Sequence, residues 1–597
     1  MDEHTIPSEA YQKNIKDYTA SLGIHKDRRT RLGVFRLVSV IAMCIATYYG
    51  FVHSWAVGWM VLIVGVALFL FLVSLDVKNN ERIYYFEKLL LINNEELSIL
   101  AGRFTHREDG LTFLPHEHPY AADLDLFGTS SLYQYINRCT SEQAKALLAS
   151  SLLFPSSSEV ILQRQEAAEE LKHQLHWRQQ LQFAGIANSV TLSTQERISS
   201  WLKSGIPFQK HWKVLAVVFP LISMGSLIAS LTGFLASPVF TLLAFCFYVI
   251  SLLISRKVSG TYEQLSRIVD QVKTLHQILQ HVENLKCKSS LLSSLQDQLR
   301  ANGKASENIL QLKKILDRFD MRLNIFAFIF LNTFLLWDLQ QVLHLNKWRE
   351  KNTASVKTWF DVIAYIEFLN TISTLAFNHP SWCLPQAVSE HFTLLANEVG
   401  HPLIREDKRI DNSFATEGIP KVSIITGSNM AGKSTFLRSV GVNLVLAQMG
   451  AAVCAKSFVF SPVELCTSMR VADNLAENAS TFYAELKKLK SIIERVNAGD
   501  KVFILLDEIL RGTNSLDKHT GSEALIKQFI RRNAVAIIAT HDVELGDLKN
   551  VFDAHIENYH FDVQVEGEEL YFDYKIKRGI CQSLNASLLM KKIGIEL

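Results

Sequence analysis

Four long apolar runs lie in the first half of the chain, and polar or basic segments flank each pair of them. The runs cover residues 37–51, 55–75, 214–234 and 239–254. They form two pairs, and neither short loop within a pair contains a lysine or an arginine. About 20 apolar residues are enough for a helix to cross a bilayer. The pattern predicts two transmembrane hairpins, and buried helices of a soluble protein are the alternative.

Basic residues concentrate in the longer segments beside these hairpins. They include Lys26, Arg28, Arg29, Arg31 and Arg36 before the first pair, and Arg256 and Lys257 after the second. Positively charged flanks stay on the cytoplasmic side of a membrane. We therefore expect four crossings of a lipid bilayer, the inner (cytoplasmic) membrane, with both termini and every large segment in the cytoplasm.

A fifth apolar run, residues 323–337, is shorter than the other candidates. As a helix its 15 residues reach only about 22 Å, less than the roughly 30 Å of a hydrocarbon core. It also contains Asn324 and Asn332, and a fifth crossing would carry the rest of the chain to the other side. We predict that it is a core helix.

After residue 400 the pattern changes to short apolar strands that end in polar loops. Residues 421–426 alternate as in a strand, residues 436–449 have helical periodicity, and the loop between them fits G-x-x-x-x-G-K-[ST]. The loop contains Gly427, Ser428, Asn429, Met430, Ala431, Gly432, Lys433, Ser434 and Thr435. Such a loop directs N–H groups and the positive end of a helix at a phosphate. It predicts a P-loop that binds ATP.

Two later strands end in side chains that complete this chemistry. One ends at Asp507 and Glu508, and the next ends at His541. In parallel sheets, ligands bind at the carboxyl ends of strands. We expect Asp507 to hold Mg²⁺ with Ser434, Glu508 to polarise the attacking water, and His541 to contact the γ-phosphate. With Lys433, Glu508 and His541 form the predicted catalytic set.

These segments resemble those of the MutS family of DNA mismatch-repair ATPases. The resemblance is carried by residues 426–435, 478–482, 507–517 and 539–545, and it extends more weakly over residues 120–210 and 258–420. It implies that Phe414 packs against the adenine and that the protein is a homodimer through its ATPase domains. It also implies that Ser480 and Thr481 complete the partner's site, at the start of a helix whose N–H groups face the γ-phosphate.

The beginning of the chain departs from this family. Mismatch-repair members start with a domain that inserts a Phe-x-Glu wedge into DNA, whereas here a basic tail and an apolar hairpin occupy that place. We therefore expect a membrane-anchored member without the mismatch-recognition domain. Its helical arms remain a candidate DNA-binding region.

The composition of the chain does not point to any further function. The formal net charge of +2 does not by itself predict nucleic-acid binding. The eight cysteines form no C-x-x-C pair, and His116-Glu117-His118 has no third ligand near it in the sequence, so we expect no structural metal.

The predicted fold is multidomain, with an α-helical core and lever region, two transmembrane helical hairpins, and a C-terminal α/β P-loop ATPase domain of the ABC type. The predicted parts are a basic tail (1–36), the first hairpin (37–75), a MutS-like helical core (76–210), the second hairpin (211–257), a helical lever or connector (258–400), and the ATPase domain with a C-terminal dimerisation tail (401–597).

The leading hypothesis is a membrane-anchored, Mg²⁺-dependent ATPase that works as a dimer and couples ATP hydrolysis to binding of structured or mismatched DNA. The alternatives are an ATP-driven membrane machine or a nucleotide-gated scaffold, neither of which binds nucleic acid. Transport is disfavoured because the four apolar runs carry no charge of the kind that marks a translocation path.

Overall fold

The computed structural model contains two compact units. The first consists of Met1–His106 and Leu175–Ile186, and the second consists of Arg107–Gln174 and Ala187–Leu597. Within these limits the structure describes residues 6–187, 191–203, 210–266, 269–428, 431–469, 481–511, 513–566 and 569–581. The end of the predicted C-terminal dimerisation tail, after residue 581, lies outside the described residues.

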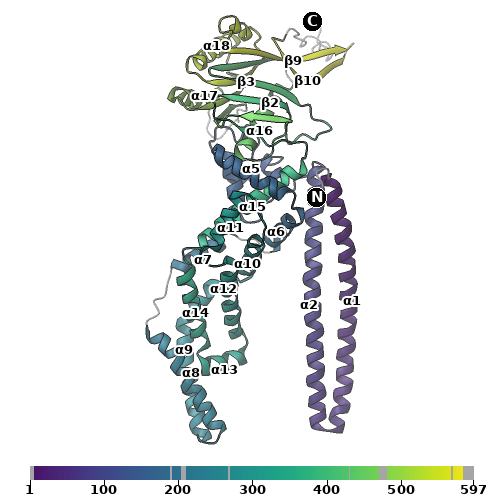
Figure 1. Ribbon diagram of the computed structural model, residues 1–597, viewed down its shortest axis with the longest axis vertical. Helices are drawn as coiled ribbons and strands as arrows, with labels where there is room; N and C mark the ends of the chain where they lie inside the picture. Colours follow the sequence, from purple (N-terminus) through teal and green to yellow (C-terminus); the bar gives the residue numbers. More distant parts are fainter. Residues whose placement is uncertain are drawn as a thin grey trace. The chain divides into compact units, whose positions relative to one another are not determined.

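The first unit is built on two long antiparallel helices, α1 (Pro7–His53) and α2 (Trp55–Leu100) (Figure 1). Between them Ser54 caps α2, because its side chain accepts a hydrogen bond from a backbone N–H of the first turn. The predicted runs 37–51 and 55–75 form one end of the pair. Both helices continue beyond these runs, so the boundaries predicted at residues 36 and 76 fall inside continuous helices.

A third helix, α6 (Leu175–Ala187), completes the first unit through buried amide groups. Gln179 Nε2 donates to Asn93 Oδ1 at 2.9 Å, and Asn14 Nδ2 donates to the same oxygen at 3.2 Å. Asn93 and Gln179 are both buried. A buried polar group is costly without a partner, so this network fixes how the three helices pack.

The second unit begins with helices and ends with an α/β domain. Its helices up to residue 378 are α3 (Leu132–Ile136), α4 (Glu142–Leu153), α5 (Ser158–Lys172), α7 (Leu192–Lys203), α8 (Lys210–Leu231), α9 (Ser237–Ser266), α10 (Val269–Glu283), α11 (Ser290–Arg300), α12 (Ala305–Asp320), α13 (Ile325–Leu335), α14 (Trp337–Asn352) and α15 (Val356–Asn378). A helical region followed by an α/β domain agrees with the predicted order.

Among the described residues, five helices are long and apolar enough to cross a membrane, by length and composition alone: α1, α2, α8, α9 and α15. The most apolar window of α15 is 89% buried, whereas those of the other four are 6–17% buried. Protein therefore covers α15, and it is a core helix. The other four leave most of their apolar surface uncovered.

The prediction of a core helix at residues 323–337 is wrong. In this segment α13 meets α14 at a bend of 78°. Its side chains are largely exposed, with Phe326 at 83% and Ile325 at 66%. The length argument considered only a span or a core helix, and not a short, largely exposed helix that packs beside the α8–α9 hairpin.

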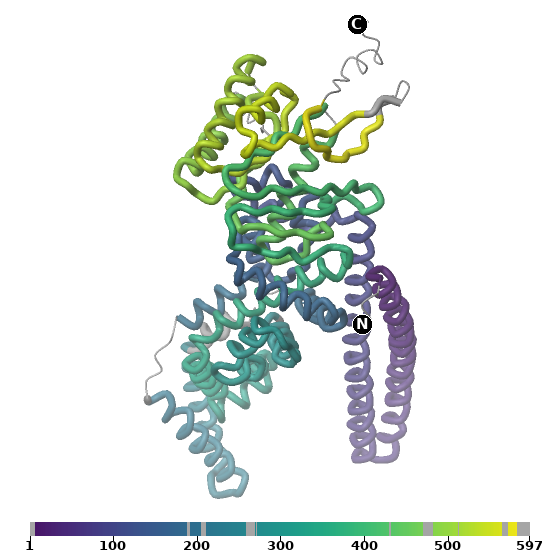
Figure 2. The backbone as a smooth tube through the Cα atoms, turned by 45° about the horizontal axis from the view of Figure 1, so that its top comes forward, coloured from purple at the N-terminus to yellow at the C-terminus, as the bar shows by residue number. Residues whose placement is uncertain are grey.

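The α/β domain contains two sheets. Its strands are β1 (Gln386–Ala387), β2 (Thr393–Val399), β3 (Asn412–Glu417), β4 (Lys421–Thr426), β5 (Ser457–Phe460), β6 (Glu464–Ser468), β7 (Val502–Asp507), β8 (Val535–Thr540), β9 (Ile556–Glu566) and β10 (Glu569–Arg578). The smaller sheet has the order β1-β5-β2-β3, and the larger has the order β10-β9-β4-β8-β7-β6. In the larger sheet only β10 pairs antiparallel. Figure 2 shows these green-to-yellow strands as a region separate from the teal helices.

The strands predicted at residues 421–426, 501–508 and 534–540 are confirmed as β4, β7 and β8. Every residue of β7 and β8 is buried, as expected for central parallel strands with helices on their faces. Helices α17 (Thr481–Ala498) and α18 (Ser515–Arg531) supply part of the core beside them. The predicted start of the domain at residue 401 is too late, because β1 and β2 already pair with β5.

Candidate functional site

A glycine-rich loop, residues 427–432, connects β4 to α16 (Lys433–Met449). Gly427 has φ of 148°, and a Cβ there would lie 2.7 Å from the carbonyl oxygen of Phe561. Gly432 has φ of 104° and is the N-cap of α16. Both conformations favour glycine. The first glycine allows the loop to pass close to β9, and the second turns the chain into the helix.

The side chain of Lys433 folds back over this loop. Its Nζ donates to the carbonyl oxygens of Gly427 at 2.7 Å and Ser428 at 2.9 Å. Burial lowers the pKa of Lys433 to about 8, because desolvation disfavours the ammonium form. A buried ammonium group that donates to neutral carbonyls would gain from an anion beside it. The loop, the N-terminus of α16 and this lysine therefore form a site suited to phosphate.

The carboxyl ends of three neighbouring strands bring the predicted catalytic groups together. The order β4-β8-β7 places the loop, His541 and Glu508 along one edge of the sheet. Lys433 Nζ lies 3.5 Å from His541 Nδ1, and His541 Nε2 is in ion-pair contact with Glu508 Oε1. The close contact with His541 lowers the pKa of Glu508 to about 2. Glu508 is therefore ionised at neutral pH.

Two residues that the sequence analysis missed hold the loop after β7. Arg511 Nη2 donates to the carbonyl oxygen of Asp507 at 2.9 Å, and its Nε lies 3.3 Å from Glu508 Oε2. The carboxylate of Glu485, on α17, accepts from the N–H groups of Leu510 and Arg511. Glu485 stands in an ordinary amphipathic helix, so only the tertiary structure reveals this contact. It fixes the backbone that follows Glu508.

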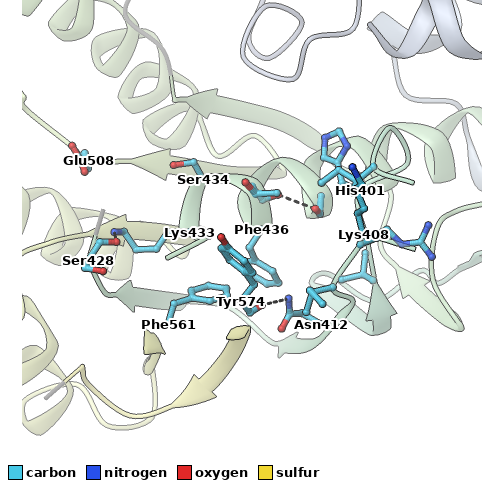
Figure 3. A pocket seen from close by; sticks show the side chains of 17 residues that line it. His401, Lys408, Asn412, Ser428, Lys433, Ser434, Phe436, Glu508, Phe561 and Tyr574 are labelled. Atoms are coloured by element: carbon cyan, nitrogen blue, oxygen red, sulfur yellow. Dashed lines mark hydrogen bonds between the residues drawn. The ribbon is translucent and has the colours of Figure 1, made fainter. Parts of the chain in front are cut away.

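A cavity of about 440 Å³ extends from the glycine-rich loop between α16 and β10. Figure 3 shows Lys433, Ser434 and Glu508 toward one side of it, and Tyr574, Phe436 and Phe561 in the middle. Polar and basic side chains line the far part, including His401, Lys408, Arg409 and Asn412. The cavity thus joins a phosphate-binding end to an aromatic section. Its volume suits a small organic ligand.

The position of Tyr574 depends on Asn412. Asn412 Nδ2 donates to the carbonyl oxygen of Tyr574 at 3.0 Å, and Asn412 Oδ1 accepts from Ile576 N at 2.9 Å. These bonds hold β10 against β3, where the pairing of β10 with β9 shifts register. A Cβ added at Gly432 would lie 3.2 Å from the Tyr574 ring, so this ring lies directly beside the loop.

The expected contact of Phe414 with a bound base is not what this geometry favours. Phe414 is 3% exposed and packs edge-on against Phe436, with ring centroids 5.7 Å apart. Its other neighbour is Tyr559, and it does not line the cavity beside the loop. Phe414 lies on β3, close to the cavity. Side chains alternate between buried and exposed along this strand, and Phe414 is at a buried position in the core.

Ser434 and Asp507 are the two residues predicted to bind a divalent cation. Ser434 follows the loop, is exposed and lines the cavity, whereas Asp507 is buried at the end of β7. Arg511 Nη2 lies 3.5 Å from Asp507 Oδ2, so a cation now neutralises this carboxylate. A hydroxyl and a carboxylate are the oxygen donors that Mg²⁺ prefers. Their joint role as Mg²⁺ ligands stays a prediction.

Several predicted residues lie outside the described residues. They are Asn429 and Met430 in the loop and Ser480 in the segment before α17. Thr481 begins α17 in the backbone, and its side chain is likewise not described. The predictions for these residues stay untested.

Comparison with known proteins concerns this same C-terminal region. Residues 423–590 match the family described as MutS domain V, a segment that starts within β4 and includes Lys433, Glu508 and His541. MutS protein homolog 4 of Mus musculus is 32% identical over 241 residues, which is 38% of this chain and 24% of that protein. DNA mismatch repair protein MutS of Chlorobium phaeovibrioides is 34% identical over 236 residues, 38% of this chain and 26% of that protein.

The C-terminal domain of this chain is therefore a MutS-family domain. The human MutS protein homolog 4 is similar to a comparable extent, at 31% identity over 247 residues. The chain spans about a quarter of the length of these relatives. MutS similarity thus covers the glycine-rich loop, the strand ends β7 and β8, and the strands β9 and β10 that carry Phe561 and Tyr574.

Proposed function

We propose that this chain is a membrane-anchored MutS-family ATPase that binds Mg²⁺-ATP, hydrolyses it as a homodimer, and couples the cycle to binding of DNA. The observation that carries the ATPase proposal is the convergence of Lys433, Glu508 and His541 beside the N-terminus of α16. The relatives named as DNA mismatch repair proteins support the proposal for DNA.

In this mechanism the glycine-rich loop is the P-loop, and its first task is to bind phosphate. The Lys433 ammonium now donates to the carbonyl oxygens of Gly427 and Ser428. Phosphate oxygens, which carry charge, are stronger acceptors than these carbonyls, so the ammonium exchanges partners when nucleotide binds. The base and ribose then occupy the aromatic section, where Tyr574 offers its ring to the base.

Glu508 acts on the water that attacks the γ-phosphate. Its pKa of about 2 keeps it ionised, so it orients and polarises water as an acceptor. His541, which contacts both Glu508 and Lys433, positions the carboxylate relative to the phosphate end. Ser434 and Asp507 would hold Mg²⁺, which supplies positive charge to neutralise the phosphates.

The test of this assignment compares substitutions at Lys433 and Glu508. Lys433→Ala should abolish tight ATP binding, because it removes the charge that faces the phosphates. Glu508→Gln should bind ATP with near-normal affinity and lower kcat by roughly 10²–10⁴. Glu523→Gln is a matched control, because this carboxylate on α18 pairs with Lys527 on the same helix. Equal loss of nucleotide binding in the Lys433 and Glu508 variants, or full turnover in Glu508→Gln, contradicts the assignment.

The membrane proposal rests on α1, α2, α8 and α9, whose apolar windows are at most 17% buried. Four crossings place both termini and the ATPase domain in the cytoplasm, where ATP is available, and make the lipid bilayer of the inner membrane a partner. In whole cells, a cysteine at the exposed position 237 (Ser237→Cys) should react with an impermeant reagent. A cysteine at the exposed Leu516, on α18, should not react. External labelling at Leu516 contradicts this topology.

The homodimer proposal concerns the start of α17, where Ser480 and Thr481 would face the γ-phosphate held by the partner. A helix N-terminus carries about +0.5 of a charge, which favours phosphate. Mixing Ser480→Arg protein with Lys433→Ala protein should restore part of the ATPase activity that each lacks alone, because one composite site stays intact. Full activity of Ser480→Arg alone contradicts a shared site.

The DNA proposal separates this function from the ATP-driven membrane machine that binds no nucleic acid. The purified protein should bind DNA with an affinity that falls as salt rises, because phosphate contacts release counterions. A panel of duplex, mismatched and branched DNA, with and without ATP, measures this directly. Absence of salt-dependent binding to every DNA in the panel favours the machine or scaffold.

A further inference from the structure

The short helix α13 differs from its neighbours in how little of its apolar surface is covered. Its sequence from Ile325 to Leu335 is apolar except for Asn332 and Thr333, and these two are its buried residues. The side chains that point outward include Phe326 at 83%, Ile325 at 66% and Phe330 at 50% exposure. A helix on the surface of a water-soluble protein has the opposite arrangement, with its apolar side chains buried and its polar side chains exposed.

Helix α13 lies against the middle of the hairpin formed by α8 and α9. Phe334 stacks on Phe240 of α9, and Ser223 of α8 donates to the carbonyl oxygen of Phe334 at 2.6 Å. Both contact residues belong to the apolar part of the hairpin. In Figure 1, α13 crosses at the ends of α12 and α14, and the tip of the hairpin extends beyond it. If the α8–α9 hairpin is inserted in a bilayer, α13 is therefore inserted as well.

An apolar groove about 370 Å³ in volume separates α13 from α9. Ala244, Phe245 and Tyr248 line it on α9, and Ile329, Phe330 and Thr333 are among the α13 residues that line it. Phe245 and Phe330 are also exposed, so the groove opens onto the same apolar surface.

The ends of α13 satisfy their backbone groups within the protein. At the start, Asn324 Oδ1 accepts from Phe326 N and Ala327 N. At the end, Gln340 Nε2 donates to Leu335 O at 2.8 Å. Backbone groups cannot be left unpaired in hydrocarbon, and irregular backbone there is tolerated only where protein supplies partners. The bend between α13 and α14 meets this condition.

We propose that α13 is embedded in the membrane without crossing it, and that a phospholipid acyl chain occupies the groove between α13 and α9. This inference rests on the proposed insertion of the α8–α9 hairpin. The 11 residues of α13 reach only about 16 Å, which is too short for a fifth span, so α13 lies across the hairpin. Lipid hydrocarbon is the occupant because the exposed face continues that of the hairpin.

Photo-crosslinking in phosphatidylcholine nanodiscs tests where α13 lies. The photoreactive residue p-benzoylphenylalanine is placed at Phe326, at Leu221 on α8, or at Leu516 in the α/β domain, all strongly exposed. We expect a phosphatidylcholine mass adduct at Phe326 and Leu221, and none at Leu516. An adduct at Leu221 without one at Phe326 overturns the inference and leaves the hairpin proposal intact. Absence of adducts at both positions overturns the hairpin proposal and this inference with it. Crosslinking of Phe326 mainly to protein also overturns the inference.

Native mass spectrometry in detergent tests the groove itself. Ala244→Trp fills the groove, and Ala229→Trp adds the same bulk on α8 outside the residues that line it. We expect Ala244→Trp to lose most of the phosphatidylcholine that co-purifies with the protein, and Ala229→Trp to retain it. Equal lipid retention in both variants overturns the assignment of the groove.

Discussion

Helices α15 and α9 are both long and apolar enough to cross a membrane, but the protein covers only one of them. The most apolar window of α15 is 89% buried, and that of α9 is 17% buried. Both helices nevertheless carry a polar residue that bonds to a neighbouring element. On α15, Glu367 accepts hydrogen bonds from Thr140 N and Ser141 N, which ties the helix to the start of α4. On α9, Ser255 donates to Asp338 Oδ2 on α14, whereas Ser251 donates to Tyr248 O of its own helix. Apolar length identifies candidate membrane spans, and the buried share of each window shows which candidate the protein itself covers.

The largest expected effect comes from removing a leucine in each helix. Leu369 on α15 is fully buried, whereas Leu242 on α9 is 65% exposed. Leu369→Ala should lower the free energy of unfolding by about 2–5 kcal/mol, because it leaves a cavity. Leu242→Ala should change it by less than about 0.5 kcal/mol, as at other uncovered positions. Thermal unfolding in detergent measures both. Similar losses in the two variants would remove the distinction between these helices.

A second prediction concerns the buried carboxylate of α15. Glu367→Ala leaves the two backbone N–H groups just before α4 without their acceptor and should cost about 1–3 kcal/mol of unfolding free energy. Glu350→Ala on α14 is the control, because this side chain bonds to Asn346 on the surface. If both variants melt at the same temperature, Glu367 does not anchor α15.

The same group predicts a pH dependence. Burial raises the pKa of Glu367 above its usual 4.5, so the folded protein binds a proton that the unfolded chain has already released. Stability from this group should therefore fall as the pH rises from 4.5 through the raised pKa. Glu367→Gln does not titrate, so the difference in melting temperature between it and the parent should change over this window. A constant difference contradicts the raised pKa.

The smallest expected effect is a pH dependence of nucleotide affinity that comes from the buried Lys433 in the α/β domain. Lys433 has a pKa of about 8 while its site is free, and phosphate favours its charged form. Above pH 8, nucleotide binding should therefore be coupled to uptake of a proton by Lys433. The affinity for nucleotide should fall by at most about tenfold for each unit that the pH rises. Lys433→Arg should lose this slope, because a guanidinium stays charged. Calorimetric titrations between pH 7 and 9.5 measure it, and equal slopes contradict the assignment.

The sequence was most informative where one strand or loop determines the chemistry. Strands β7 and β8 are buried throughout, so they read as continuous apolar runs, and the residues that follow them lie at one sheet edge. Glu485, Asn412 and Tyr574 were missed because their roles depend on contacts between segments far apart in the chain. The error at α13 has a similar cause, since hydropathy gives no information about which neighbour covers a helix.

The first unit combines segments that the ribosome synthesises at different times. Its two long helices are complete at residue 100, yet α6, which brings Gln179 to Asn93, follows only after residue 174. At about 5–20 residues per second, a ribosome needs several seconds to synthesise the intervening segment. During that interval Asn93 lacks the partner that α6 supplies. A nascent chain stalled before residue 175 should therefore expose the α6-binding surface of α2 to chaperones, and one stalled well after α6 has left the ribosome should not.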